Sequence, residues 1–154
     1  GNLDIDNLIK ATHKNMVQFR LEWIPYEDFK NVGNIAEGGF SMIFTALWEK
    51  GKITSYYDNR DFNRAGPETV VLKILKDSQN INSAFIKELR NITETLPNSY
   101  KRHIIQYYGV SQDPVTKNYI FVMSHMKQGS LHEYLSKNFN DIKWTDWGKS
   151  KRSK

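Results

Sequence analysis

The run Val70-Val71-Leu72-Lys73-Ile74-Leu75 decides how the rest of the sequence is interpreted. Its β-branched and aliphatic residues predict a buried strand, and a single lysine interrupts it. An unpaired ammonium is too costly to keep in an apolar interior, so Lys73 must either reach water or face a counter-charge. Two interpretations follow: an edge strand with its lysine in solvent, or a lysine that points into a functional site.

A counter-charge is available on the helix that the sequence predicts over Ser83 to Leu96. Ser83 can cap the start of this helix and Pro97 ends it. Its apolar stripe consists of Phe85, Leu89, Ile92 and Leu96. Glu88 lies beside that stripe rather than opposite it. The spacing therefore favours an ion pair between Lys73 and Glu88 that joins helix to sheet; a solvated glutamate is the alternative.

Upstream, two adjacent glycines lie between two predicted strands, in the run Ile-Ala-Glu-Gly-Gly-Phe-Ser-Met-Ile from Ile35 to Ile43. Gly38 and Gly39 are expected to supply the positive φ that a close hairpin needs. Glycines also let backbone N–H groups approach a phosphate without a Cβ clash. The flanking Ile35 and Ile43 could cover a flat ring. Taken alone, the motif is more typical of an ordinary β-turn.

The remaining segments complete an α+β pattern. Ile104 to Val110 and Tyr119 to Met123 are predicted strands, and Ser130 to Leu135 begins a second helix. The polar stretch from Glu49 to Pro67 is interpreted as a long connector. The order β-β-β-α-β-β-α predicts a mostly antiparallel sheet with one helix packed on it.

Taken together, these motifs resemble the protein kinase series of a glycine-rich loop, a V-A-I-K strand and an αC glutamate. The run from Tyr119 to Met126, followed by Gly129-Ser130-Leu131, resembles the fifth strand, the hinge and the start of helix αD. The lead-in L-E-W-I-P-Y, from Leu21 to Tyr26, is most similar to the tyrosine-kinase-like branch. The resemblance covers about residues 21–138.

The resemblance implies a kinase N-lobe of the α+β class. Its sheet would have five mostly antiparallel strands with one packed αC helix, followed by the hinge and the start of αD. We expect a lead-in helix over 1–24, the N-lobe over 25–123, the hinge and the start of αD over 124–139, and a basic, disordered tail over 140–154.

The same resemblance implies that the ligand is ATP. Lys73 would hold the α- and β-phosphates, and Glu88 would position Lys73. Met123 would occupy the gatekeeper position, and the backbone of Ser124 and Met126 would read the adenine edge. The rest of the implied ATP site consists of Ile35, Ala36, Gly38, Gly39, Phe40, Ser41, Ile43 and Val71, in which Ala36 and Ser41 replace the first and third loop glycines.

The sequence lacks the kinase residues that transfer phosphate. Kinases use the aspartate of H-R-D as base and the aspartate of D-F-G to hold magnesium. None of the four histidines precedes Arg-Asp, and Asp146-Trp147-Gly148 follows the αD region with no catalytic loop before it. We therefore expect a truncated kinase that is inactive alone, with no metal site and with magnesium needed only in a full-length form. The alternative is a non-catalytic kinase-like module that docks to a partner kinase or scaffold.

The composition of the chain excludes several other classes of function and partner. The net charge is +5, and the stretch from Asp141 to Lys154 holds five cations and two anions, which is +3 of it. A nucleic-acid groove needs its charge spread over a folded face, so no nucleic-acid partner is expected. The absence of cysteine excludes disulfides and thiol chemistry. No apolar run approaches the roughly 20 residues of a membrane helix. The expected location is cytoplasmic, without a membrane partner.

Overall fold

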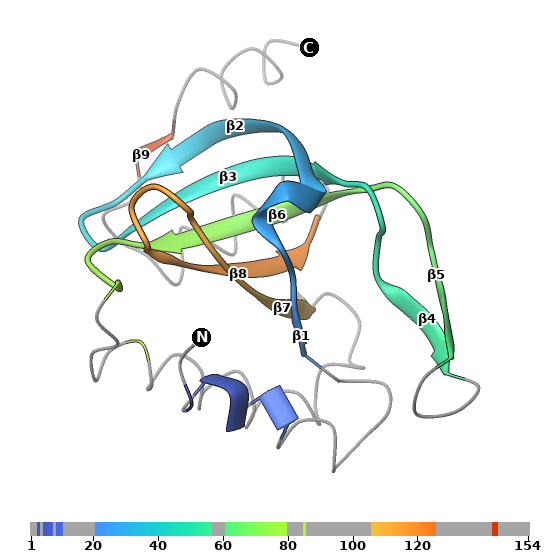
Figure 1. The fold of residues 1–154 in the computed structure, drawn as a ribbon. Helices are drawn as coiled ribbons and strands as arrows, with labels where there is room; N and C mark the ends of the chain where they lie inside the picture. Colours follow the sequence, from blue (N-terminus) through green and yellow to red (C-terminus); the bar gives the residue numbers. More distant parts are fainter. Residues whose placement is uncertain are drawn as a thin grey trace, which may run out of the picture.

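The computed structural model describes residues 3, 5–7, 9–10, 21–56, 61–79, 85, 106–125 and 143–144 (Figure 1). These residues form a seven-stranded sheet in the order β1-β7-β8-β6-β3-β2-β9 and a separate two-stranded sheet of β4 and β5. The elements are β1 (Glu22–Trp23), the 3-10 turn η2 (Tyr26–Asp28), β2 (Phe29–Glu37), β3 (Ser41–Trp48), β4 (Ile53–Tyr56), β5 (Phe62–Arg64), β6 (Glu68–Leu75), β7 (Tyr107–Gln112), β8 (Tyr119–Ser124) and β9 (Lys143–Trp144).

The prediction of a mostly antiparallel sheet is confirmed. Strand β3 pairs antiparallel with β2 and β6, and β8 pairs antiparallel with β6 and β7. Only β1 pairs in parallel, with β7, among the strands of the described ranges. The predicted count of five strands is too low. The five expected strands correspond to β2, β3, β6, β7 and β8. The two further strands, β1 and β9, lie at the edges of the sheet and have two residues each. A strand this short cannot be predicted from an alternation of apolar and polar side chains.

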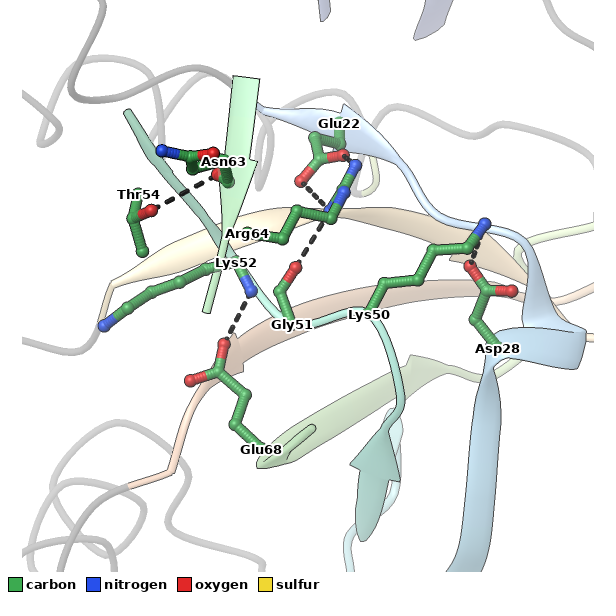
Figure 2. A network of polar contacts seen from close by, with 9 residues as sticks. All are labelled: Glu22, Asp28, Lys50, Gly51, Lys52, Thr54, Asn63, Arg64 and Glu68. Carbon is green, nitrogen blue, oxygen red and sulfur yellow. Dashed lines mark hydrogen bonds and ion pairs between the residues drawn. The ribbon is translucent and has the colours of Figure 1, made fainter. Parts of the chain in front are cut away.

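The interpretation of Glu49 to Pro67 as a plain connector is wrong, because this stretch contains the hairpin β4–β5 (Figure 1). A two-stranded hairpin is marginal by itself, so contacts with the main sheet must hold it. Figure 2 shows these contacts. The Arg64 guanidinium reaches Glu22 at 2.6 Å and the Gly51 carbonyl oxygen at 2.8 Å, and the Lys52 N–H donates to Glu68 at 2.8 Å.

Strand β6 is buried on both faces, which explains why apolar residues flank Lys73 on both sides in the sequence. On one face, Val70, Leu72 and Ile74 belong to a cluster with Ile24, Phe29, Ala46, Trp48, Ile120 and Val122. Leu75 packs on the other face, against a cluster of Ile5, Ile9, Leu21, Phe85, Val110, Tyr119 and Phe121. Described residues between 3 and 10 are helical, where the lead-in helix is predicted, and lie against this second face (Figure 1).

Several predicted elements lie wholly or mostly outside the described residues. Of the helix predicted over 83–96, only Phe85 is described; it is helical and fully buried. The hinge and αD beyond His125 are outside as well. Within the tail predicted to be disordered, Lys143 and Trp144 instead form β9, which pairs with Ala36 and Glu37 of β2. Strand pairing uses the backbone, so the polar composition of a segment does not prevent it. Among the described residues, no helix is long and apolar enough to cross a membrane.

Candidate functional site

Lys73 lies in a central strand of the sheet, not at an edge. Strand β6 pairs with β3 on one side and β8 on the other, so that Lys73 lies opposite both Ile43 and Phe121. Only 2% of the residue is exposed. The alternative of an edge strand with its lysine in water is therefore excluded. Phe121 belongs to the cluster that includes Phe85, so Lys73 projects from the face on which that cluster packs.

Lys73 belongs to one of two neighbouring rows of paired residues on this face. The first row runs across four strands through Ala36, Ile43, Lys73 and Phe121. The second row, two residues away along β6, consists of Thr45, Val71 and Met123. Every aliphatic side chain in these rows is buried. The structure thus brings together the predicted residues Ala36, Ile43, Val71, Lys73 and Met123.

A β-bulge sets the position of Ile35 beside this face. The register between β2 and β3 shifts between Asn34 and Ala36, which leaves Ile35 as the extra residue. Bulges redirect side chains, and here Ile35 is buried. The Asn34 side-chain amide donates to the carbonyl oxygens of Ala36 (3.2 Å) and Ile43 (3.3 Å), across the bulge. The sequence analysis missed Asn34, because nothing in its local pattern marks a register shift.

The glycine turn between β2 and β3 is closed by hydrogen bonds. The Gly38 N–H donates to the Ser41 carbonyl oxygen at 2.8 Å, and the Lys76 N–H donates to the Phe40 carbonyl oxygen at 2.9 Å. Among the described residues the glycines with positive φ are Gly51 and Gly66. Gly38 and Gly39 are not among them, so the expected positive φ at this pair is wrong. Phe40, whose backbone amide is expected to help cover the phosphates, is 84% exposed.

The end of β8 is fixed against the start of β7. The Ser124 N–H donates to the Gln106 carbonyl oxygen at 2.8 Å, and the Gln106 N–H donates to the Ser124 hydroxyl at 3.0 Å. Ser124 directly follows Met123, so the predicted gatekeeper and the first hinge residue are held in place together. Met126 and Glu88, the other predicted hinge and ion-pair residues, lie outside the described residues.

The residues of the glycine turn and of the strand with the buried lysine lie within a stretch that matches a family model. A sequence model described as protein tyrosine and serine/threonine kinase matches residues 28–151. This chain belongs to the protein kinase family. A search of curated proteins finds no match. Within the kinase domain, the described residues contain no group of three or more His, Asp or Glu placed to hold a metal ion.

Proposed function

We propose that this kinase domain binds ATP on the sheet face that carries Lys73. The supporting observation is the burial of Lys73 in a central strand, in a row with Ile43 and Phe121 and next to the row that contains Val71 and Met123. A buried ammonium requires anionic or strongly polar partners. In kinases the lysine of this strand provides charge for the α- and β-phosphates, and the αC glutamate positions it. We assign these roles to Lys73 and Glu88.

The apolar rows suit a flat purine ring. Four buried residues would enclose the adenine: Ile35, Ile43, Val71 and Met123. Ala36 pairs with Ile43 and would extend this apolar surface. The Ser124 N–H already donates to Gln106, so Ser124 would contact the adenine edge through its carbonyl oxygen. Met126 would supply the second hinge contact. Backbone amides near Gly38, Gly39 and Phe40 would cover the phosphates; in this structure the Gly38 amide donates to the Ser41 carbonyl oxygen.

Within the family, the lead-in from Leu21 to Tyr26 favours the tyrosine-kinase-like branch. ATP supplies a transferable γ-phosphate in kinases, but these 154 residues contain no H-R-D and no D-F-G aspartate. We therefore propose that the chain as given binds ATP without transferring phosphate. Incubation of the purified chain with γ-labelled ATP, magnesium and protein substrates should give no labelled product. Labelling that disappears in the Lys73→Met variant would contradict this.

The binding proposal is tested by calorimetric titration with ATP and with adenosine. Lys73→Met should weaken ATP binding about tenfold or more and leave adenosine binding nearly unchanged, since the lysine contacts only phosphate. Lys50→Met is the matched control, because Lys50 is exposed and pairs with Asp28 at 3.2 Å. Circular dichroism confirms that each variant is folded. Equal ATP affinities for Lys73→Met and the wild type would contradict the proposal. A folded wild type that binds no nucleotide would favour the docking module for a partner kinase or scaffold.

A further inference from the structure

Ser78 bridges the ends of two neighbouring strands. Strands β6 and β8 pair as far as Ile74 and Ile120, one residue short of Leu75 and Tyr119 at the strand ends. The Ser78 hydroxyl donates to the Leu75 carbonyl oxygen at 2.7 Å, and the Tyr119 N–H donates to the same hydroxyl at 2.8 Å. The serine side chain thus takes the place of a direct backbone hydrogen bond between the two strands.

The backbone of Ser78 is held as well. Its N–H donates to the Asn118 side-chain oxygen at 3.1 Å, and the residue is only 1% exposed. Asn118 is fixed in the turn between β7 and β8, because its carbonyl oxygen accepts from the Asp113 N–H at 2.9 Å. Removal of the Ser78 hydroxyl would leave a buried carbonyl group and a buried N–H group without their partner, which is costly.

The bridged strand ends lie beside Lys73. Lys73 pairs with Phe121, and Leu75 and Tyr119 are each two residues away from this pair on the same two strands. Residues two apart on a strand face the same side of the sheet. The row that Ser78 bridges is therefore the neighbour of the Lys73 row on one face.

Phe85 connects the bridged row to the Lys73 row. Its ring centroid lies 4.9 Å from that of Tyr119 and 5.2 Å from that of Phe121. Leu75 packs against the same cluster. Rings at these distances are in packing contact. A shift of Tyr119 away from β6 would therefore disturb the aromatic cluster around the residue that pairs with Lys73.

We propose that Ser78 is a positioning residue for Lys73, which holds the neighbouring row of the sheet in place and thereby supports the contact of the lysine with phosphate. This inference rests on the proposed ATP site. Val71 and Met123, two of the residues assigned to the adenine, form the row on the far side of the Lys73 row. Ile43 meets Lys73 from β3, on the side away from β8. A disturbance at Ser78 therefore reaches the lysine before it reaches the adenine surface.

The test compares two buried serines. Ser78→Ala removes the bridging hydroxyl, whereas Ser111→Ala removes a hydroxyl of β7 that is also buried and has no hydrogen-bond partner among the described residues. Neither substitution changes the charge. Calorimetric titration gives the affinities for ATP and adenosine, and amide hydrogen exchange in the nucleotide-free protein gives the protection of the Tyr119 N–H. Ser78→Ala should bind ATP about three- to tenfold more weakly, change adenosine affinity less than about twofold, and exchange faster at Tyr119. Ser111→Ala should match the wild type in both measurements.

Two further variants separate positioning from a general loss of stability. In the Lys73→Met background, Ser78→Ala should weaken ATP binding no further, because the contact that it supports is already absent. Asn118→Ala removes the acceptor of the Ser78 N–H and should weaken ATP binding about two- to threefold. It takes the place of Ser78→Ala if circular dichroism shows that the latter is unfolded. Equal losses of ATP and adenosine affinity would overturn the positioning role, and so would an undiminished loss of ATP affinity in the Lys73→Met background.

The same measurements separate this inference from the proposed function. A wild type that binds no ATP contradicts both. A wild type whose ATP affinity depends on Lys73 but not on Ser78 supports the proposed function and overturns this inference alone. Unchanged exchange at Tyr119 in Ser78→Ala would show that the serine does not bridge the two strands in solution.

Discussion

The guanidinium of Arg64 forms a bidentate ion pair with the carboxylate of Glu22, which lies 42 residues earlier in the chain. The shorter contact is 2.6 Å and the longer one 3.3 Å. The same guanidinium lies over the rings of Phe62 and Trp48, at 4.9 and 5.8 Å from their centroids. Glu22 belongs to β1, so this pair joins the β4–β5 hairpin to the edge of the main sheet (Figure 2).

Arg64→Met should therefore lower the free energy of unfolding by about 1–3 kcal/mol, because it leaves the partly buried Glu22 carboxylate without its charge-assisted bonds. Both side chains are less than a quarter exposed, at 23% and 17%. Lys50→Met removes an ion pair in which the lysine is 58% exposed, and should cost less than about 1 kcal/mol. Urea unfolding measures the free energy of unfolding of both variants. Equal small losses in the two variants would show that the Arg64 pair does not anchor the hairpin.

Ile5→Ala should destabilise the protein by about 2–4 kcal/mol, because Ile5 is buried in the cluster that contains Phe85 and Phe121. Phe85 stacks on Phe121 at 5.2 Å between ring centroids. The matched control is Leu3→Ala in the same helical stretch, where the side chain is 72% exposed and the change should be within about 0.5 kcal/mol. Thermal unfolding distinguishes the two. If both substitutions are neutral, the N-terminal residues do not pack on this face in solution.

The sequence could predict the central strands and Lys73 because their signals are local. A lysine within an apolar run is visible without knowledge of the fold, and the structure buries it as the site interpretation requires. The same holds for the five long strands, each of which has enough apolar residues to show a pattern. Short connections explain the antiparallel pairs β2–β3 and β7–β8, whereas β6 pairs with β3 and with β8 across much longer stretches of chain.

The features that the sequence did not reveal depend on partners distant in the chain. The hairpin β4–β5 has polar residues and is anchored through Arg64 to Glu22, 42 positions away. Nothing in the sequence distinguishes Lys76 from an ordinary surface charge, and only the fold brings it to Gly38, 38 positions earlier. The bulge at Ile35 follows from the register of two strands. Pairing across such separations has no local signature in composition or periodicity.

Tyr108 should make stability depend on pH in the alkaline range. Burial, and then the nearby Glu68 carboxylate, raises the pKa of the Tyr108 phenol from its ordinary value of 10.0 to about 12. The fold thus favours the neutral phenol. Its contribution to stability is complete below about pH 10 and is lost as the pH rises from about 10 to about 12. Urea unfolding across this range should show a fall in wild-type stability that is smaller in Tyr108→Phe. The same fall in the variant would assign the effect to another group.

Gly109→Ala should separate β1 from β7. Gly109 pairs with Glu22, and a Cβ on Gly109 would overlap the Glu22 backbone carbonyl oxygen, which cannot rotate away as a flexible side chain would. We expect a loss of about 1–3 kcal/mol in the free energy of unfolding. The matched control is Gly33→Ala in β2, where no atom lies within 4 Å of the added carbon. That substitution should change stability by less than about 1 kcal/mol.

The double variant Gly109→Ala/Arg64→Met shows whether these two contacts hold one segment. Glu22 meets Gly109 through its backbone and Arg64 through its carboxylate, so displacement of β1 by the new methyl group should already weaken the ion pair. The combined loss of unfolding free energy should then be smaller than the sum of the two single losses. Strictly additive losses in urea unfolding would mean that β1 accommodates the methyl group without moving Glu22. In that case the hairpin anchor and the parallel strand pair would stabilise the domain independently.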